Sequence, residues 1–111
     1  MSDTINFEDF TKVDLRIGTI IDVDDFPKAQ NSSFKLTIDF GDLGIKKSSA
    51  QITSVYGKKE LIGKQIVAVV NFPKKQIANF MSECLILGAV DSQDVILLNP
   101  ESPVINGSTV S

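Results

Sequence analysis

Carboxylates and lysines are the side chains that could carry chemistry in this chain, because it contains no histidine and only one cysteine, Cys84. Without histidine there is no Ser-His-Asp triad and no histidine-bound zinc, and one thiol is too few for a thiolate metal site. The densest acidic cluster, Asp22, Asp24 and Asp25, matches no calcium-binding loop and fits a solvated strand end. Gly41-Asp42-Leu43-Gly44 lacks the Gly-Lys-Ser/Thr ending of a phosphate loop and indicates a hairpin turn. The sequence therefore predicts no enzyme, no metal site and no cofactor.

The stretch from Asn71 to Gly88 has instead the pattern of a binding edge. An apolar strand, Ile66 to Phe72, ends at Pro73, which has no N–H to donate to a sheet. The loop that follows carries apolar side chains beside lysines: Lys74, Lys75, Ile77, Phe80 and Met81. Apolar groups exposed beside cations are typical of a site where a partner supplies the missing contacts. The alternative for these apolar side chains is that they fold back onto the core.

Length and composition indicate one domain, residues 1–111, because 111 residues with 42% apolar content suffice for one core and not for two. No apolar run approaches the roughly 20 residues that span a bilayer, and the N-terminus is acidic where a signal peptide would be basic. We therefore expect a cytoplasmic protein without membrane insertion. The single cysteine excludes an internal disulfide, in keeping with a reducing compartment.

Strands dominate the expected secondary structure. From Val13 to Asp24 the sequence alternates, with Val13, Leu15, Ile17, Thr19, Ile21 and Val23 on one face, and Gly18 provides a place for a bend. Phe34 to Phe40 alternates in the same way, and the more polar stretch Ile45 to Ile52 follows the Gly-containing turn as a third strand. One face of that third strand is expected to be wet or functional.

The rest of the chain supplies a short helix, two more strands and extended ends. The segment from Thr53 to Lys64 is the one most strongly predicted to be helical, for one or two turns that would cover one end of a barrel. Two apolar runs, Cys84 to Val90 and Val95 to Leu98, flank a polar turn, and the segment from Asn99 onward contains two prolines and a glycine. This order predicts an all-β fold: a five-stranded Greek-key OB-fold barrel with a short helix and extended terminal segments.

Several separated blocks of the sequence resemble the CsaA family of export-related chaperones. The blocks are Asp14-Leu15-Arg16-Ile17-Gly18, IDFGDLGIKKSSAQIT from Ile38 to Thr53, VAVVNFP from Val67 to Pro73, Met81-Ser82-Glu83 with Leu85 to Gly88, and PVING from Pro103 to Gly107. They occur in the family's order and spacing and cover almost the whole chain. The resemblance implies a cytoplasmic homodimer that binds unfolded or export-bound polypeptides without ATP and works alongside the secretory translocase machinery.

CsaA-like proteins are in turn similar to a wider superfamily of tRNA-binding OB domains, which implies a second function, tRNA recognition through the same barrel face. Those relatives carry basic residues in the loop before a Ser-x-Gly-Met turn. This chain has Gln76 and Ala78 at the corresponding positions and Cys84-Leu85 in place of Gly-Met, so that only Asn71 and Ser82 match directly. The polypeptide reading is therefore favoured, and tRNA binding stays open as the alternative.

The net charge of the chain also favours polypeptide binding over tRNA binding. Nucleic-acid affinity depends on neutralising phosphates with lysine and arginine, yet the net charge is −3 and Arg16 is the single arginine. A local basic patch could still attract RNA, because surface potential depends on how charges are distributed as well as on their sum. The candidate nucleic-acid-binding residues are Arg16, Lys46, Lys47, Asn71, Lys74, Lys75 and Ser82. The alternatives are a solubilising surface for the lysines and a structural pair with Asp14 for Arg16.

The candidate polypeptide-binding residues combine an apolar patch with polar groups that can pair with a peptide backbone. They are Ser48, Ser49, Gln51, Asn71, Phe72, Phe80, Met81, Ser82 and Glu83. For the serines and Gln51 an ordinary polar strand face is the alternative. Apolar residues near both chain ends could form the interface of a homodimer or fold onto their own barrel: Phe7, Phe10, Val104, Ile105 and Val110.

Overall fold

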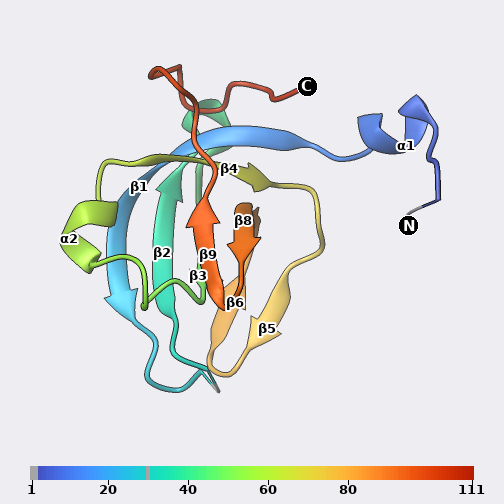
Figure 1. The fold of residues 1–111 in the computed structure, drawn as a ribbon. Helices are drawn as coiled ribbons and strands as arrows, with labels where there is room; N and C mark the ends of the chain where they lie inside the picture. The colour runs from blue at the N-terminus through green and yellow to red at the C-terminus, as the bar shows by residue number, and fades with distance from the viewer. Residues whose placement is uncertain (1–2, 30) are drawn as a thin grey trace.

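A five-stranded antiparallel sheet curls into most of a barrel in the computed structural model, which describes residues 3–29 and 31–111 (Figure 1). The strand order is β3-β2-β1-β4-β7. The strands are β1 (Leu15–Asp25), β2 (Phe34–Asp39), β3 (Ile45–Ala50), β4 (Gln65–Val69) and β7 (Leu85–Ile86). This architecture confirms the predicted OB-type barrel. No helix within the described part of the chain is long and apolar enough to cross a membrane.

The core lies inside the barrel, where β2 contributes the side chains that its alternation predicts. Phe34, Leu36 and Ile38 are buried, while the residues between them are partly exposed. Each buried aliphatic or aromatic side chain of this size contributes roughly 1.5–3 kcal/mol through its removal from water. The turn from β2 to β3 is a single 3-10 turn, Gly41–Leu43, so the segment Gly41–Gly44 is the expected hairpin connection.

The single alternation predicted for β1 is wrong, because Gly18 and Ile20 face the core before an irregularity in the strand and Val23 faces it after. The pairing of β1 with β2 shifts between Ile20 and Asp22, which places Ile20 and Val23 in the core and leaves Ile21 exposed. A bulge adds one residue to a strand and so reverses which face the following residues occupy. The irregularity therefore falls at Ile21, and Gly18 instead makes room for the close packing of Ile38 and Phe40.

The helix of one or two turns expected within residues 53–64 is the single turn α2 (Lys58–Leu61), whose Leu61 is fully buried in the core. A second short helix, α1 (Phe7–Thr11), precedes β1. The two late apolar runs form β7 and a hairpin of β8 (Gly88–Asp91) and β9 (Asp94–Leu97). The C-terminal segment is extended and bonds to the outside of β1, with the Gly107 N–H donating to the Ile17 carbonyl at 2.7 Å.

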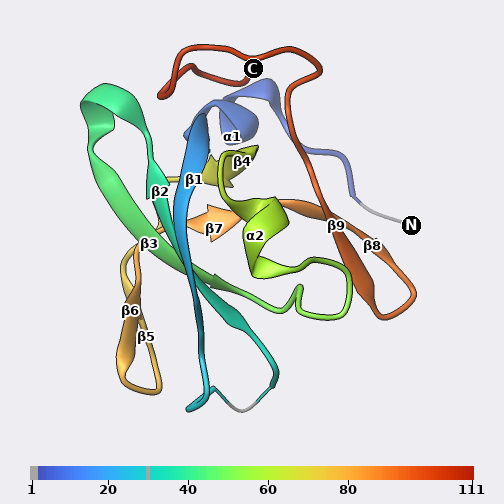
Figure 2. The ribbon, with the colours of Figure 1, turned by 90° about the vertical axis from the view of Figure 1, so that its left-hand side faces the viewer.

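A hairpin that the sequence did not predict projects from the barrel between β4 and β7. It consists of β5 (Lys75–Ile77) and β6 (Phe80–Ser82), and it occupies the segment expected to be a loop (Figure 2). Its tip is attached to the end of β1, because the rings of Phe80 and Phe26 meet edge to face at 5.3 Å between centroids. The Lys35 ammonium of β2 lies 5.8 Å from the centroid of the Phe26 ring and 6.0 Å from that of Phe80, so one cation contacts both aromatic residues.

Candidate functional site

The barrel has one open seam, between β3 and β7. These strands stand at the two ends of the sheet order, and among the described residues no ladder pairs them. Glu83 closes the part of the seam beside Lys47. Its N–H donates to the Lys47 carbonyl at 2.7 Å, and its carboxylate accepts the Lys47 N–H at 3.0 Å. The Ser48 hydroxyl adds one bond by donating to the Cys84 carbonyl at 2.8 Å.

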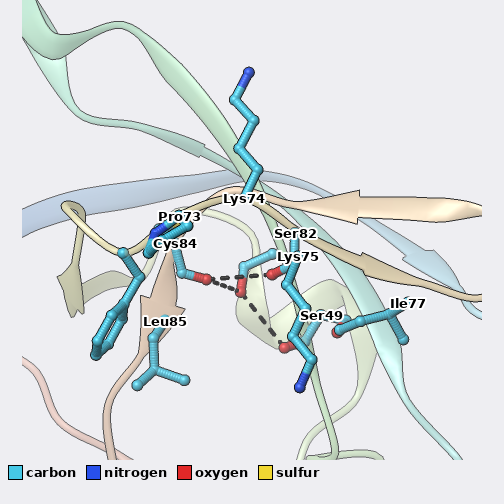
Figure 3. A pocket seen from close by; sticks show the side chains of 10 residues that line it. Ser49, Pro73, Lys74, Lys75, Ile77, Ser82, Cys84 and Leu85 are labelled. Atoms are coloured by element: carbon cyan, nitrogen blue, oxygen red, sulfur yellow. Dashed lines mark hydrogen bonds between the residues drawn. The ribbon is translucent and has the colours of Figure 1, made fainter.

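Below this closure the seam opens into a cavity of about 460 Å³ (Figure 3). Its lining is mainly apolar with a serine and lysine margin: Ser48, Ser49, Phe72, Pro73, Lys74, Lys75, Ile77, Ser82, Cys84 and Leu85. In Figure 3 the side chains of Leu85 and Ile77 lie on opposite sides of Ser49, and Lys74 points away from the other labelled groups. Phe72 and Leu85 are 54% and 49% exposed, so the apolar walls are accessible.

A second cavity of about 600 Å³ continues the first along β3. Four residues line both cavities: Ser49, Lys75, Ile77 and Leu85. The continuation adds Gln51 and Ile52 after β3, Ile86 of β7, and Val95 and Leu97 of β9. We call the two cavities together the seam groove. It runs beside β3, with the β5–β6 hairpin on one side and β7 and β9 on the other.

The structure brings several of the predicted polypeptide-binding residues to the seam groove. Ser49, Phe72 and Ser82 line its first part, and Gln51 lines the second. Ser48 also borders the groove, but its side chain is buried and bonded to Cys84.

Three other residues predicted to bind polypeptide do not line the seam groove: Asn71, Phe80 and Met81. Asn71 bridges the N-terminal segment to the barrel, since its side chain accepts the Asp14 N–H and donates to the Lys12 carbonyl. Phe80 folds back onto Phe26, which is the alternative the sequence left open for it. Met81 is exposed on β6 and does not line the groove.

The predicted basic residues divide into two sets. Lys74 and Lys75 line the groove, where the Lys74 ammonium lies 3.5 Å from the Glu83 carboxylate and Lys75 has no carboxylate within ion-pair distance among the described residues. Arg16 does not line the groove. Its guanidinium donates to the Asp14 carboxylate at 2.6 Å and to the Gly107 carbonyl at 3.0 Å. The structure thus places Arg16 in the attachment of the C-terminal segment.

Lys46 and Lys47 lie on β3 beside the closed part of the seam. The Lys47 backbone is bonded to Glu83, and neither lysine lines the groove itself. They lie near the closed end of the groove, whereas Lys74 lines its first part and Lys75 lines both parts.

Cys84 is the one thiol at the groove. Burial raises its pKa to about 11, so the group stays protonated and unreactive at neutral pH. The described residues contain no group of histidine, cysteine or carboxylate side chains arranged to hold a metal ion. The groove therefore offers apolar walls, hydroxyls and ammonium groups, which suit binding.

Sequence reasoning missed Pro73 and Leu85 as parts of the site, and it placed Ile77 in the candidate binding loop without naming it among the polypeptide-binding residues. The signal for Leu85 was weak because it stands inside an apolar run that reads as core. Leu85 is exposed because β7 ends the sheet, where it pairs with β4 on one side and with no described strand on the other.

Comparisons with known proteins agree with this geometry. A family described as "Putative tRNA binding domain" matches residues 15–109. A solved structure of the chaperone CsaA from Bacillus anthracis is 52% identical, covers 98% of this chain and 100% of its own, and superposes with a TM-score of 0.94. The CsaA chaperone structure from Picrophilus torridus is 51% identical over 97% of this chain and 100% of its own, with a TM-score of 0.92.

Curated relatives include much longer enzymes. The methionine–tRNA ligase of Nanoarchaeum equitans is 40% identical over 108 residues, which are 96% of this chain and 13% of that protein. The chain therefore corresponds to a small part of such relatives, and the matching family is that of a binding domain. From the family match and the CsaA structures together, the chain belongs to the tRNA-binding domain family and, within it, to the CsaA-type proteins.

Proposed function

We propose that this protein is an ATP-independent chaperone that binds unfolded or export-bound polypeptide segments in the seam groove. The observation that carries the proposal is the accessible apolar lining of that groove, in a chain that is 51–52% identical to two solved CsaA chaperones. In this proposal the protein acts in the cytoplasm, delivers clients to the secretory translocase machinery and catalyses no reaction. The groove needs no nucleotide, because binding and release depend on the ligand's own contacts.

The expected affinity is modest. Full burial of one large apolar side chain contributes about 1.5–3 kcal/mol, and Phe72 and Leu85 are already about half buried. A few such contacts must also offset the lost translational and rotational freedom of the ligand, which is several kcal/mol. Micromolar or weaker binding follows, in the range expected for a protein that must release many different clients.

We further propose that two copies form a homodimer through their terminal segments. Phe7 of α1 is 78% exposed and Ile105 of the C-terminal segment is 84% exposed. Such apolar groups on a small domain favour a self-complementary interface. A dimer would present two grooves to one flexible chain and increase the apparent affinity through effective concentration.

tRNA binding is the second candidate, favoured by the family match and by the methionine–tRNA ligase relatives. Lys75 has no ion-pair partner among the described residues and lies beside Lys74 at the groove. Against this, the net charge is −3 and Glu83 already pairs with Lys74. RNA binding that depends on so few lysines would be weak and would fall steeply with salt.

The deciding experiment is fluorescence anisotropy against a labelled unfolded polypeptide and against tRNA, each at low and at physiological salt. Polypeptide binding that survives physiological salt while tRNA binding disappears supports the chaperone function. Saturable tRNA binding at physiological salt without a polypeptide signal would replace it with the second candidate. Sedimentation velocity on the same samples tests the dimer.

Two pairs of variants locate the binding surface. Leu85→Ser places a hydroxyl in the groove, and Ile62→Ser makes a comparable change at a residue that is 51% exposed and lies outside the groove. Only the first is expected to weaken polypeptide binding, by about tenfold. The double variant Lys74→Ala/Lys75→Ala should lower tRNA affinity and its salt slope more than Lys58→Ala/Lys59→Ala on α2, which removes the same charge.

A further inference from the structure

One edge of β3 has no strand partner among the described residues, and beyond Lys47 this edge faces the seam groove. In the part of the chain that the structure describes, β3 pairs with β2 and with no other strand, so its other edge is the margin of the seam. Lys47 shows which residues face that edge, because both its N–H and its carbonyl bond to Glu83. Backbone groups alternate between the two edges of a strand, so those of Ser49 point to the same side as those of Lys47, about 6.8 Å further along.

The Ser49 backbone has no strand partner on that side among the described residues. Its N–H has no backbone acceptor there, and its carbonyl receives only a long bond of 3.5 Å from the Ser48 hydroxyl, drawn in Figure 3. Gln51, the next residue of the same parity, directly follows the strand and also lines the groove. An unpaired edge of this kind is a template for a further strand.

The surroundings of this edge indicate which partner fits. Ile77 and Leu85 flank Ser49 with apolar side chains, and Ile86, Val95 and Leu97 extend the apolar surface past Gln51. Lys75 adds a cation without a carboxylate partner among the described residues. A ligand with main-chain N–H and carbonyl groups, apolar side chains and a nearby acidic residue would satisfy all of these groups.

We propose that an extended polypeptide segment binds by adding a strand to β3 at Ser49 and Gln51, with its apolar side chains in the seam groove and an acidic residue near Lys75. This inference rests on the proposed polypeptide-binding function and specifies its mode. Main-chain pairing explains how one groove would accept many sequences, because every non-proline residue carries the same donor and acceptor.

The edge suits a single extended chain better than the other two possible occupants. RNA has donors in its 2′-hydroxyls and bases, but it does not carry the regularly spaced N–H and carbonyl groups of an extended chain that would pair with both backbone groups of Ser49. The sheet edge of a second folded copy would meet the β5–β6 hairpin before it reached β3, because that hairpin forms one wall of the groove.

Peptide N-methylation tests the pairing directly. The probe is a fluorescein-labelled peptide, Glu-Thr-Val-Thr-Val-Thr-Glu, and two versions carry two N-methyl groups each, on both valines or on two of the threonines. The N–H groups of valines and threonines leave opposite edges of such a strand. One version should therefore bind at least tenfold more weakly than the parent, and the other should bind about as well. Equal affinities of the two versions, whether retained or lost, would overturn the strand-addition mode.

A protein variant provides the reciprocal test. Ser49→Pro removes the N–H that faces the groove, and Ser49→Ala keeps it while removing the hydroxyl. We expect Ser49→Pro to weaken the parent peptide about tenfold more than Ser49→Ala does. Equal effects would overturn the mode, as would dissociation of a dimer by Ser49→Pro in sedimentation velocity, which would assign the edge to a second copy. If Ser49→Pro does not fold, the N-methylated peptides decide.

These experiments separate the two levels of the proposal. A parent peptide that does not bind at all, together with an unfolded polypeptide that does not bind, contradicts the chaperone function itself. Binding of the parent that is insensitive to the position of N-methylation leaves the chaperone function in place and contradicts only strand addition.

Discussion

Glu83 pairs with both backbone groups of Lys47, as a residue of a neighbouring strand would. Its N–H donates to the Lys47 carbonyl at 2.7 Å, while its side-chain carboxylate accepts the Lys47 N–H at 3.0 Å. The other carboxylate oxygen lies 3.5 Å from the Lys74 ammonium. One residue therefore closes the barrel, sets where the open edge of β3 begins and neutralises part of the lysine pair at the groove.

Glu83→Ala should destabilise the protein by about 1 kcal/mol, because the Lys47 N–H loses its acceptor. The same change should raise tRNA affinity at low salt, since Lys74 loses its counter-charge. Urea unfolding and fluorescence anisotropy measure the two effects. Glu101→Ala removes an exposed carboxylate elsewhere and serves as the control; equal gains in tRNA affinity from both variants would mean that only net charge matters.

Gly18→Ala should be among the most destabilising small substitutions, by about 2–3 kcal/mol. An added Cβ would lie 2.6 Å from Ile38 Cγ2 and 2.7 Å from Phe40 Cε1, inside a core that has no room to shift cheaply. Gly57→Ala, whose new Cβ would approach only the Glu60 carboxylate at 3.9 Å, should change stability by tenths of a kcal/mol. Thermal or urea unfolding compares the two, and similar losses would contradict the packing argument.

Arg16→Ala should loosen the C-terminal segment. The variant removes the hydrogen bond to the Gly107 carbonyl and the pair with Asp14, with an expected loss of about 1–2 kcal/mol. Hydrogen exchange should then speed up at the Gly107 and Val110 amides, which bond to Ile17 and Leu15. Lower tRNA affinity with unchanged exchange would instead return Arg16 to the RNA-binding surface.

Cys84 should make stability fall at high pH. Burial raises its pKa from 9.0 to about 11, so the folded state holds the proton more tightly than the unfolded chain does. The resulting stabilisation is fully present below about pH 9 and is lost as pH rises toward 11. The stability difference between the natural chain and Cys84→Ala should shrink over that range, by about 2 kcal/mol. Alkylation by iodoacetamide should accelerate over the same range, and fast alkylation at pH 7 would contradict the shift.

Much of the fold could be predicted because strands with one buried face show it in their alternation. Phe34 to Phe40 is such a case, and its register in the structure is the predicted one. The alternation of β1 was predicted wrongly at Ile21, because no residue in the sequence marks the bulge that changes the register there. The β5–β6 hairpin was missed because its tight turn lacks glycine, and Ala78 takes the left-handed conformation at φ 52°.

The candidate site was predicted in outline from the mixture of lysines and apolar residues after Pro73. Which residues face the groove could not be predicted, because this depends on how the hairpin folds back. Phe80 turns toward Phe26, whereas Ile77, on the paired strand, lines the groove. Asn71 matched a binding motif in the sequence and is used to hold the N-terminal segment.

The double attachment of the β5–β6 hairpin has a thermodynamic consequence for any ligand. The base of the hairpin is fixed at Lys47 through Glu83, and its tip is fixed at Phe26 through Phe80, with Lys35 against both rings. The wall of the groove is thus ordered before a ligand arrives. Most of the entropy lost on association then belongs to the incoming chain, so affinity should rise when that chain is already extended and fall when it must first unfold.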